Sequence, residues 1–321
     1  MAGGGLARMV FGKIAGLVLT VLAASVLVFF SMYLVPGDPL TFLMRGRSPS
    51  PEAIKAVSEQ YGLNKPVVVQ YFDWLLNMLH GDFGRSFQYR ENVSTLLASR
   101  AGSTFWLVVI SGVVIGVVGL AAGIVAALNR GKIADKAILI GATGLAAIPS
   151  FVGAIVLTAV FSVQLGWFPS FGSGQGALDT IYHLALPAMA LALTFIALVA
   201  RVTRSSMVEQ LALEHVEVAT SRGMSRVRVV MRHVLRNALN PILTISGMLV
   251  AGLLVASSIV EAAFGLSGMG SLLVQSVDRM DFPVVQAIVL IIVTLFVLSN
   301  TVVDILASML DPRTAAGAAA R

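Results

Sequence analysis

Six long runs of apolar residues dominate the chain and restrict what it can fold into. A membrane-spanning helix needs about 20 consecutive, mainly apolar residues, because backbone polar groups have no water to bond in the hydrocarbon core. The first run is too long for a signal peptide and no small-residue cleavage site follows it, so it is interpreted as a retained anchor. The runs predict six transmembrane helices, at Ile14–Leu34, Ser103–Leu128, Ala137–Gln164, His183–Ala200, Ile242–Phe264 and Val284–Leu310.

The composition agrees with an all-α, polytopic membrane protein. Of the 321 residues, 57% are hydrophobic and 12% are charged, and the mean hydropathy is +0.89. Soluble domains are about 25% charged, so a water-soluble globule, a disordered chain and a nucleic-acid-binding protein are excluded. The chain has no cysteine, which excludes a disulfide framework, a thiolate catalyst and a cysteine-ligated metal.

Two of the six runs contain a proline. Pro149 lies within the third run and Pro187 lies near the start of the fourth. Neighbouring helices or water can satisfy the carbonyl groups that a proline leaves unbonded inside a membrane helix. The sequence therefore predicts kinks at both positions rather than breaks.

The distribution of lysine and arginine places both termini in the cytoplasm. With the N-terminus inside, the cytoplasmic segments hold 14 of the 22 basic residues, whereas the outer loops 165–182 and 265–283 hold only Arg279. The outer segment 36–102 holds seven, but a loop of that length translocates largely regardless of its charge. The domain organisation expected is an N-terminal segment with the first helix (1–35), an outer lid (36–102), a core (103–310) with an inner loop (201–240), and a cytoplasmic tail (311–321).

The outer segment predicts two amphipathic helices. Ser50-Pro51-Glu52 has the pattern of a helix start, and Gly62 follows the apolar positions of that helix. A second helix is predicted from Pro66 to Gly81, with apolar residues at helical spacing at Val68, Tyr71, Phe72, Leu75, Leu76 and Leu79. These helices are interpreted as a lid, either structural or a landing site for a soluble partner.

The inner loop carries acidic residues followed by an amphipathic helix. Glu209, Glu214 and Glu217 precede a short stretch that Gly223 ends. The next helix is expected to lie along the inner membrane surface, with arginines reaching headgroups or water. Its predicted apolar face is Val227, Val230, Met231, Val234, Leu235 and Leu239, and Arg228, Arg232 and Arg236 lie on another face.

Several kinds of chemistry are absent from the sequence. The chain has neither the phosphate-binding pattern G-x-x-x-x-G-K-[ST] nor the zinc-protease pattern H-E-x-x-H. Gly265-Leu266-Ser267-Gly268 resembles a serine nucleophile motif, but such a serine needs a histidine base on a later helix. No histidine follows His233, so these glycines are interpreted as a turn.

The stretch from Glu217 to Gly223 resembles the E-A-A-x-x-x-G signature of ABC importer permeases, with Pro241 at the next span. It departs from that signature in Val218 and in the residues between Ala219 and Gly223. The detailed match is to the first, B-type permease subunit of the dipeptide/oligopeptide/nickel branch. Other matching stretches occur in the order found in that family, namely Val35–Pro39, Tyr61–Pro66, Gly81–Gly84, Arg232–Ala238, Glu261–Phe264, Gly268–Gly270, Asp281–Gln286 and Leu310–Arg313.

The resemblance implies a subunit of an ATP-driven importer of di- or oligopeptides in the plasma membrane. It implies four kinds of partner: a second six-helix permease, two cytoplasmic ATPases, an extracytoplasmic substrate-binding protein and the lipid bilayer. No cofactor is expected on this chain, since ATP and Mg²⁺ belong to the ATPases, and no enzymatic activity is expected. A coupling helix is implied at about Glu214–Arg222, where a small residue such as Ala219 would let it sit deep in an ATPase groove. The residues assigned to coupling are Glu214, Glu217, Val218, Ala219, Arg222 and Gly223.

Residues of the substrate path are candidates only by position. Polar and ionisable groups within spans mark a pathway or form bonds between helices, and bonds between helices are the more frequent case. The candidates are Ser150, Thr244, Ser246, Glu261, Asn300 and Asp304.

Two alternatives to peptide import stay open. Within the same architecture, the cargo could be a nickel chelate, glutathione or another small solute, although no ligand cluster is spaced for a metal. A secondary transporter would need paired discontinuous spans and central carboxylates, whereas the carboxylates here lie near the ends of the spans.

Overall fold

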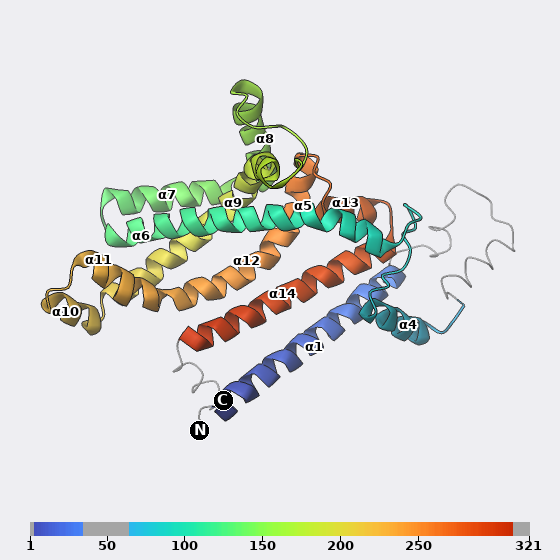
Figure 1. Ribbon diagram of the computed structural model, residues 1–321, viewed down its shortest axis with the longest axis horizontal. Helices are drawn as coiled ribbons and strands as arrows, with labels where there is room; N and C mark the ends of the chain where they lie inside the picture. Colours follow the sequence, from blue (N-terminus) through green and yellow to red (C-terminus); the bar gives the residue numbers. More distant parts are fainter. Residues whose placement is uncertain (1–2, 35–63, 311–321) are drawn as a thin grey trace.

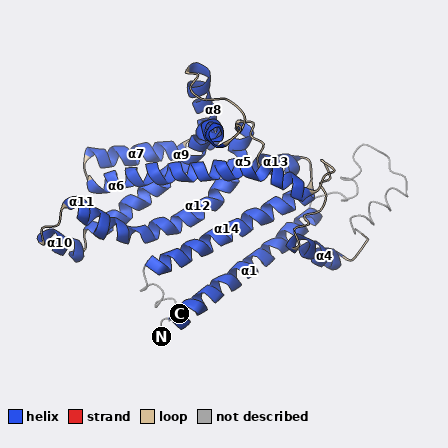
Figure 2. Ribbon diagram, in the orientation of Figure 1, coloured by secondary structure: helices blue, strands red, loops and turns tan. Residues whose placement is uncertain are grey.

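The computed structural model describes residues 3–34 and 64–310, and every element named within them is a helix (Figure 2). One isolated antiparallel bridge joins Arg85 and Asn92. The elements in chain order are α1 (Gly3–Leu34), α4 (Val67–Leu79), α5 (Val93–Val114), η1 (Ile115–Gly119), α6 (Leu120–Leu128), α7 (Ile133–Ala147), α8 (Ser150–Leu157), η2 (Thr158–Gln164), α9 (Ala177–Leu211), α10 (Glu214–Ser221), α11 (Arg226–Val229), η3 (Val230–Leu235), α12 (Arg236–Ala263), α13 (Met269–Asp278) and α14 (Phe282–Leu310).

The predicted all-α membrane architecture is confirmed. Among the described residues, five continuous helices are long and apolar enough to cross a membrane. The third predicted span, Ala137–Gln164, is instead a pair of helices, α7 and α8–η2, that meet at 98°. The five continuous spans are Phe11–Leu34, Val93–Leu128, Ala177–Leu211, Arg226–Ala263 and Phe282–Val303.

The predicted kink at Pro149 is wrong, because the helix breaks there. Ile148 and Pro149 are both extended, with ψ of 117° and 140°. The proline ring disfavours the helical conformation of the residue before it, and α8 then begins afresh at Ser150. Figure 1 shows α8 leaving the line of α7. Pro187, in contrast, lies inside the continuous helix α9, as predicted.

The central helix of the bundle is α9. It packs against α5, α6, α7, α8 and α12, and α12 packs in turn against α14. In Figure 1 the start of α1, the end of α14, and α10 lie towards one end of the molecule, and α4 and α13 lie towards the other. The two ends correspond to the segments that the sequence assigns to the inner and the outer side.

The fourth and fifth spans are longer than predicted at the end of the bundle that carries α10. Helix α9 continues from Ala200 to Leu211, and the fifth span begins at Arg226 rather than Ile242. The predicted interfacial helix is therefore the first part of that span. Its buried face also differs from the prediction, because the π-helical turn η3 adds a residue to one turn and rotates the face. Val229, Val230, Val234 and Ala238 are buried, whereas Val227 and Met231 are exposed.

The second lid helix is confirmed as α4, and the first predicted one, near Ser50, lies outside the described residues. A buried carboxylate, Asp281, joins the segment after α4 to the start of α14. It accepts hydrogen bonds from Ser86 Oγ at 2.5 Å, from the Phe87 amide at 3.0 Å and from the Gln88 amide at 3.2 Å. Asp281 belongs to one of the sequence stretches that carry the family resemblance, and this contact ties that stretch to the segment before the second span.

Two glycines, one at the end of η1 and one in α6, let this continuous helix approach α9 closely. A Cβ at Gly119 would lie 2.9 Å from Val199 Cβ, and a Cβ at Gly123 would lie 2.7 Å from the Ala200 carbonyl oxygen. At Gly116, in the same continuous helix, a Cβ would have nothing within 4 Å. The helices on either side therefore depend on Gly123 for their spacing and not on Gly116.

We expect Gly123→Ala to lower the thermal stability of the detergent-purified protein, because it forces α6 away from α9. Overpacking of this kind costs about 1–3 kcal/mol. Gly116→Ala is the matched control, since both substitutions raise helix propensity equally. Tryptophan fluorescence during heating measures the effect, and equal midpoints for the two variants would contradict this account of the α6–α9 contact.

Candidate functional site

The predicted coupling helix is α10, and its end is fixed by a left-handed glycine. Gly223 has φ +77°, a region that disfavours residues with a side chain. The Gly223 amide bonds the Thr220 carbonyl at 2.9 Å, and the Met224 amide bonds the Ala219 carbonyl at 3.3 Å. These two bonds form a Schellman motif, which ends a helix and turns the chain. The role expected of Gly223 as a turn residue therefore has a specific geometry.

One face of α10 packs on the rest of the chain. Val216 and Ala219 are buried, and they belong to an apolar cluster that includes Met207, Val230 and Val234. Ala219 thus lies on the face of α10 that packs against the rest of the chain, where a small side chain allows a close approach. This differs from the expectation that Ala219 would enter a groove on a partner.

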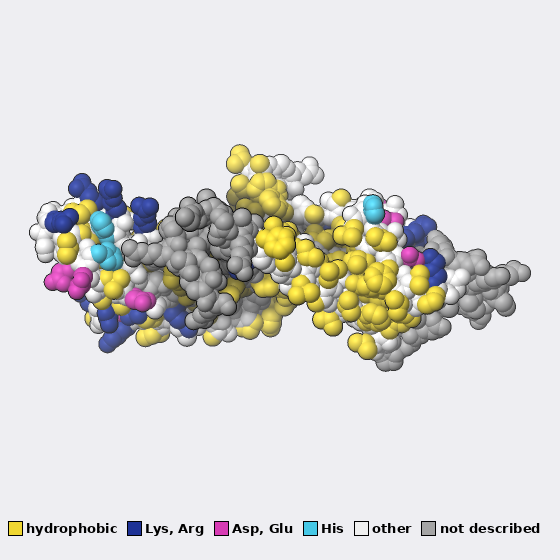
Figure 3. Space-filling model, turned by 90° about the horizontal axis from the view of Figure 1, so that it is seen from below, with side chains coloured by type: hydrophobic (Ala, Val, Ile, Leu, Met, Phe, Trp, Pro, Cys, Tyr) yellow, Lys and Arg dark blue, Asp and Glu magenta, His cyan; other side chains and the backbone are white. Residues whose placement is uncertain are grey.

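The opposite face of α10 is exposed. Glu214, Glu217, Val218 and Arg222 all lie on it, and the Val218 side chain is 48% exposed. Neither glutamate forms an ion pair within the part of the chain that the structure describes. Both acids lie in the first turn of α10, where the helix dipole favours negative charge. Figure 3 shows lysine and arginine side chains gathered at this same end of the molecule.

The surface against which α10 packs contains a cavity. A cavity of about 320 Å³ lies behind the helix, between the end of α6, the end of α9, and α11. Thr220 and Val216 line it from α10, and Arg226 and Val230 line it from the next span. A hydrogen-bond contact at 3.3 Å joins His215 Nε2 to Asn237 Nδ2 of α12. The helix is therefore held at its edges and has space behind it.

A partly buried ion pair fixes the end of α9 that leads into α10. Arg204 donates from Nε to Asp135 Oδ1 at 2.5 Å and from its second guanidinium nitrogen to Oδ2 at 2.7 Å. The Gly131 amide also donates to Asp135 Oδ2 at 2.9 Å. Bidentate pairs of this kind are geometrically specific. Sequence reasoning missed the pair, because Asp135 lies between lysines and reads as part of a charged flank.

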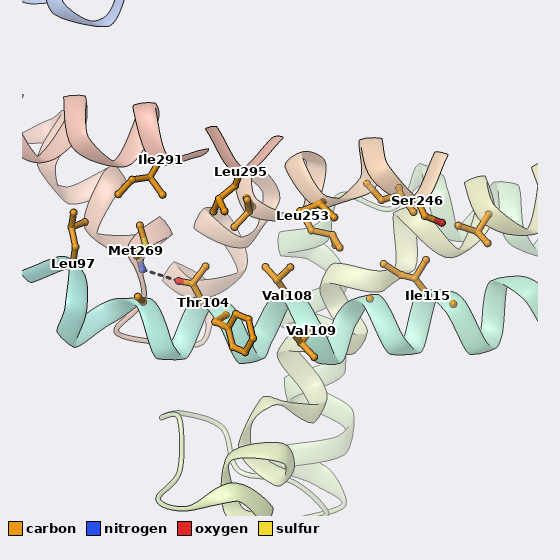
Figure 4. Close-up of a pocket in the computed structure, with 18 of the residues that line it drawn as sticks. Leu97, Thr104, Val108, Val109, Ile115, Ser246, Leu253, Met269, Ile291 and Leu295 are labelled. Atoms are coloured by element: carbon orange, nitrogen blue, oxygen red, sulfur yellow. Dashed lines mark hydrogen bonds between the residues drawn. The ribbon is translucent and has the colours of Figure 1, made fainter. Parts of the chain in front are cut away.

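A larger, apolar cavity of about 710 Å³ opens between α5, α12, α13 and α14. Figure 4 shows Val108 on α5 facing the side of the cavity formed by Leu253 on α12 and Leu295 on α14. Its polar side chains are Thr104 and Ser246, and Ser246 donates to the Ile242 carbonyl at 2.8 Å. Of the six path candidates, Ser246 is the one that lines this cavity.

Glu261 is fully buried and bonds three helices together at the end of the bundle that carries α13. Its carboxylate accepts hydrogen bonds from Thr104 Oγ1 of α5 at 2.6 Å and from the Ser271 amide at 2.8 Å. Thr104 Oγ1 in turn accepts a bond from the Met269 amide at 2.8 Å. The carboxylate therefore lies at the N-terminus of α13, where the helix dipole favours a negative charge.

The glycines near α13 have packing roles that the sequence did not reveal. Gly265 has φ +60°, which confirms the predicted turn. A Cβ at Gly268 would collide with the Glu261 carboxylate, and a Cβ at Gly270 would lie 2.6 Å from Ser258 Cα. These glycines let α13 pack directly on the end of α12.

The other path candidates lie apart from the large cavity. Ser150 begins α8, and Thr244 is exposed and bonds the Asn240 carbonyl at 3.0 Å. Asn300 donates to the Phe296 carbonyl of its own helix at 3.0 Å, and its Oδ1 faces Gly247 of α12. The side chain of Asp304 is not among those described. The structure does not bring these candidates together into one site.

Comparison with protein families gives two matches that together cover most of the chain. A family described as the binding-protein-dependent transport system inner membrane component matches residues 119–316. A companion family that describes the N-terminal part of such components matches residues 6–108.

Individual proteins also resemble the chain over nearly its full length. It is 37% identical over 303 residues to the glutathione transport system permease protein GsiC of Escherichia coli, which covers 94% of this chain and 97% of that protein. The GsiC protein of Salmonella typhimurium is 38% identical over 304 residues, with the same coverage. Among solved structures, an inward-facing MetNI methionine ABC transporter chain gives a TM-score of 0.56 at 19% identity. That match covers 67% of this chain and 96% of the other, and it indicates a common fold.

Proposed function

Because the chain belongs to the family of binding-protein-dependent transport system inner membrane components, we propose that it forms half of the channel of an ATP-driven peptide importer. As an ABC importer permease subunit, it is a multi-pass membrane protein. The peptide cargo, the partners and the cytoplasmic position of both termini are parts of the proposal.

The observation that carries the proposal is the exposed face of α10. Glu214, Glu217 and Val218 project from a short helix at the end of the bundle that carries many basic residues. A helix with a charged, solvated face and a cavity of about 320 Å³ behind it suits docking to a soluble protein. Two cytoplasmic ATPases, which hold ATP and Mg²⁺, are the partners proposed for this face and its counterpart on a second permease.

This chain contributes to transport by changing conformation and not by catalysing a reaction. Closure of the ATPases on ATP displaces α10, and the spans change from inward-open to outward-open. A ligand shifts such an equilibrium only by its differential affinity for the two states. An extracytoplasmic binding protein delivers the cargo to the outward-open state.

Small peptides are the proposed cargo class, and glutathione, itself a tripeptide, is a specific candidate. Two relatives at 37% and 38% identity are named as glutathione transport permeases, which supports glutathione. A nickel chelate has less support, since the described residues contain no cluster of metal-ligating side chains. Competition of labelled glutathione uptake by unlabelled dipeptides and by a nickel chelate distinguishes these cargoes.

Purification from membranes and transport in vesicles test the assembly. The chain should co-purify with two ATPases and a second six-span subunit. Vesicles that contain the complex and its binding protein should take up cargo when ATP is supplied to the ATPase side. Uptake by this chain alone, driven by a proton or sodium gradient, would instead establish a secondary transporter.

We expect Glu217→Lys to uncouple ATP hydrolysis from uptake while leaving assembly intact. The substitution reverses one charge on the exposed face of α10 and removes no packing contact. Glu209→Lys is the matched control, because Glu209 is also exposed but lies on α9. The ratio of cargo imported to phosphate released measures coupling. An unchanged ratio in Glu217→Lys, or an equal fall in both variants, would contradict the assignment of this face.

A further inference from the structure

Helix α4 has three kinds of surface in order around its axis. The side towards the bundle holds Tyr71 and Met78, which are buried. The next side is apolar but exposed, and a third side carries Gln70, Asp73 and Asn77. The exposed apolar residues are Val68, Phe72, Leu76 and Leu79, with exposed fractions of 61%, 55%, 55% and 75%.

The position of α4 along α1 shows that it does not stand above the membrane spans. The Tyr71 hydroxyl lies 2.9 Å from Ser25 Oγ, and both groups are buried. Ser25 is nine residues before the end of α1 at Leu34, which is about 13 Å along the helix axis at 1.5 Å per residue. The Trp74 and Phe29 rings also contact each other, with centroids 5.4 Å apart. Helix α4 is therefore beside the outer part of a membrane-spanning helix.

The exposed apolar surface of α4 continues onto α1. On α1, Val26, Leu27 and Leu34 are 40%, 74% and 83% exposed. Only 11% of the apolar window of this span is buried inside the protein, and an exposed apolar surface on a helix of this length suits the hydrocarbon of a bilayer. Figure 3 shows an extended hydrophobic surface at the end of the molecule where α1 and α4 lie. Because the two apolar surfaces are continuous, lipid that covers α1 would also cover the apolar side of α4.

The polar side of α4 carries a connected network. Lys65 Nζ donates to Asp73 Oδ2 at 2.7 Å, and Gln70 Nε2 donates to the Lys65 carbonyl at 2.8 Å. Tyr33 of α1 donates from its hydroxyl to Gln70 Oε1 at 2.7 Å. Tyrosine and tryptophan are enriched at membrane–water boundaries, because an apolar ring and a polar group meet there. The three sides of α4 therefore suit three surroundings: protein for the buried side, lipid for the exposed apolar side and water for the polar side.

We propose that α4 is an interfacial helix of the outer leaflet, which places Phe72, Leu76 and Leu79 among lipid acyl chains beside the outer third of α1. Helices of this kind bury their apolar face about 5–10 Å into the boundary between headgroups and acyl chains. The helix then fixes the depth of the segment that precedes the second span. The proposal concerns a lipid contact and does not depend on the cargo or on the ATPases.

The absence of cysteine from the chain allows a direct test. A single cysteine is introduced by Leu76→Cys, or by Asn77→Cys as the matched control one residue away on the polar side. Each full-length chain carries a nitroxide label and is reconstituted, with the subunits that co-purify with it, into vesicles of phosphatidylethanolamine and phosphatidylglycerol. Collision rates with oxygen, which concentrates in lipid, and with a water-soluble nickel chelate are measured by electron paramagnetic resonance.

The ratio of oxygen to nickel-chelate collisions is expected to be severalfold higher at position 76 than at position 77. Equal ratios with frequent nickel collisions would show that water covers the apolar side and would overturn the proposal. Few collisions with either reagent at position 76 would show that protein covers it, which also overturns the proposal. Phe72→Cys, on the same apolar side, repeats the measurement independently in case Leu76→Cys fails to assemble.

Discussion

Replacement of Gly223 by valine (Gly223→Val) is expected to abolish most cargo uptake while the complex still assembles. Gly223 adopts φ +77°, and a side chain in the left-handed region costs about 1–2 kcal/mol. Relief of that strain would break the Schellman bonds of Gly223 and Met224, and α10 would no longer leave the bundle at the same angle. If the displaced α10 docks with a free energy that is about 1.4 kcal/mol less favourable, the docked fraction falls about tenfold. Uptake per complex in vesicles measures the loss.

The control for this variant separates backbone conformation from side-chain volume. A Cβ at Gly223 would meet nothing within 4 Å, so a clash is not the reason for the expected effect. Asparagine tolerates the left-handed conformation far better than valine does. Gly223→Asn should therefore retain most of the uptake that Gly223→Val loses. Equal losses in both variants would mean that the positive φ is not what matters at this position.

The largest loss of stability is expected from Glu261→Ala. The substitution leaves the Thr104 hydroxyl and the Ser271 amide without an acceptor in a site where Glu261 is fully buried. Each buried donor left unsatisfied costs about 1–3 kcal/mol, and removal of the side chain also leaves a cavity. The N-terminus of α13 should separate from α5 and α12. The temperature at which the detergent-purified protein unfolds, followed by tryptophan fluorescence, should fall sharply.

Two further variants define the cause of that loss. Glu261→Gln keeps the shape and one acceptor oxygen, so it should be less destabilising than Glu261→Ala. Glu209→Ala removes an exposed glutamate from α9 and should change the unfolding temperature little. An unfolding temperature for Glu261→Ala close to that of the unmodified chain would show that these hydrogen bonds do not hold α13 in place.

The sequence predicted the helical membrane architecture because hydropathy reports which segments suit lipid. It did not predict where the helices end, because a helix satisfies its own backbone groups in water as well as in lipid. Helix α9 thus runs past Ala200 to Leu211, and the fifth span begins at Arg226. The break at Pro149 and the continuity at Pro187 could not be distinguished from proline alone, since neighbouring helices decide the outcome. Helix α13 was missed because its ten residues lie in a segment too short and polar for a span.

The candidate coupling site was predicted in outline, and its packing was not. Glutamates in a first turn and a glycine after the helix are local signals, and the sequence contains both of them. The direction in which Ala219 faces depends on how α10 packs against Met207 and Val234, which no local pattern specifies. The pairing of Asp135 with Arg204 joins residues that are far apart in the chain, so it was invisible for the same reason.

The uninterrupted length of α9 has a mechanical consequence for the whole subunit. The helix extends from Ala177 to Leu211, and α10 begins three residues later. Its 35 residues span about 52 Å at 1.5 Å each. Several helices pack around α9. A force on α10 can therefore tilt α9 as a rigid body about its packed middle. A tilt of about 5° over that length displaces one end relative to the other by roughly 4–5 Å. A small displacement at one membrane surface is therefore transmitted to the other surface without any change in the conformation of α9.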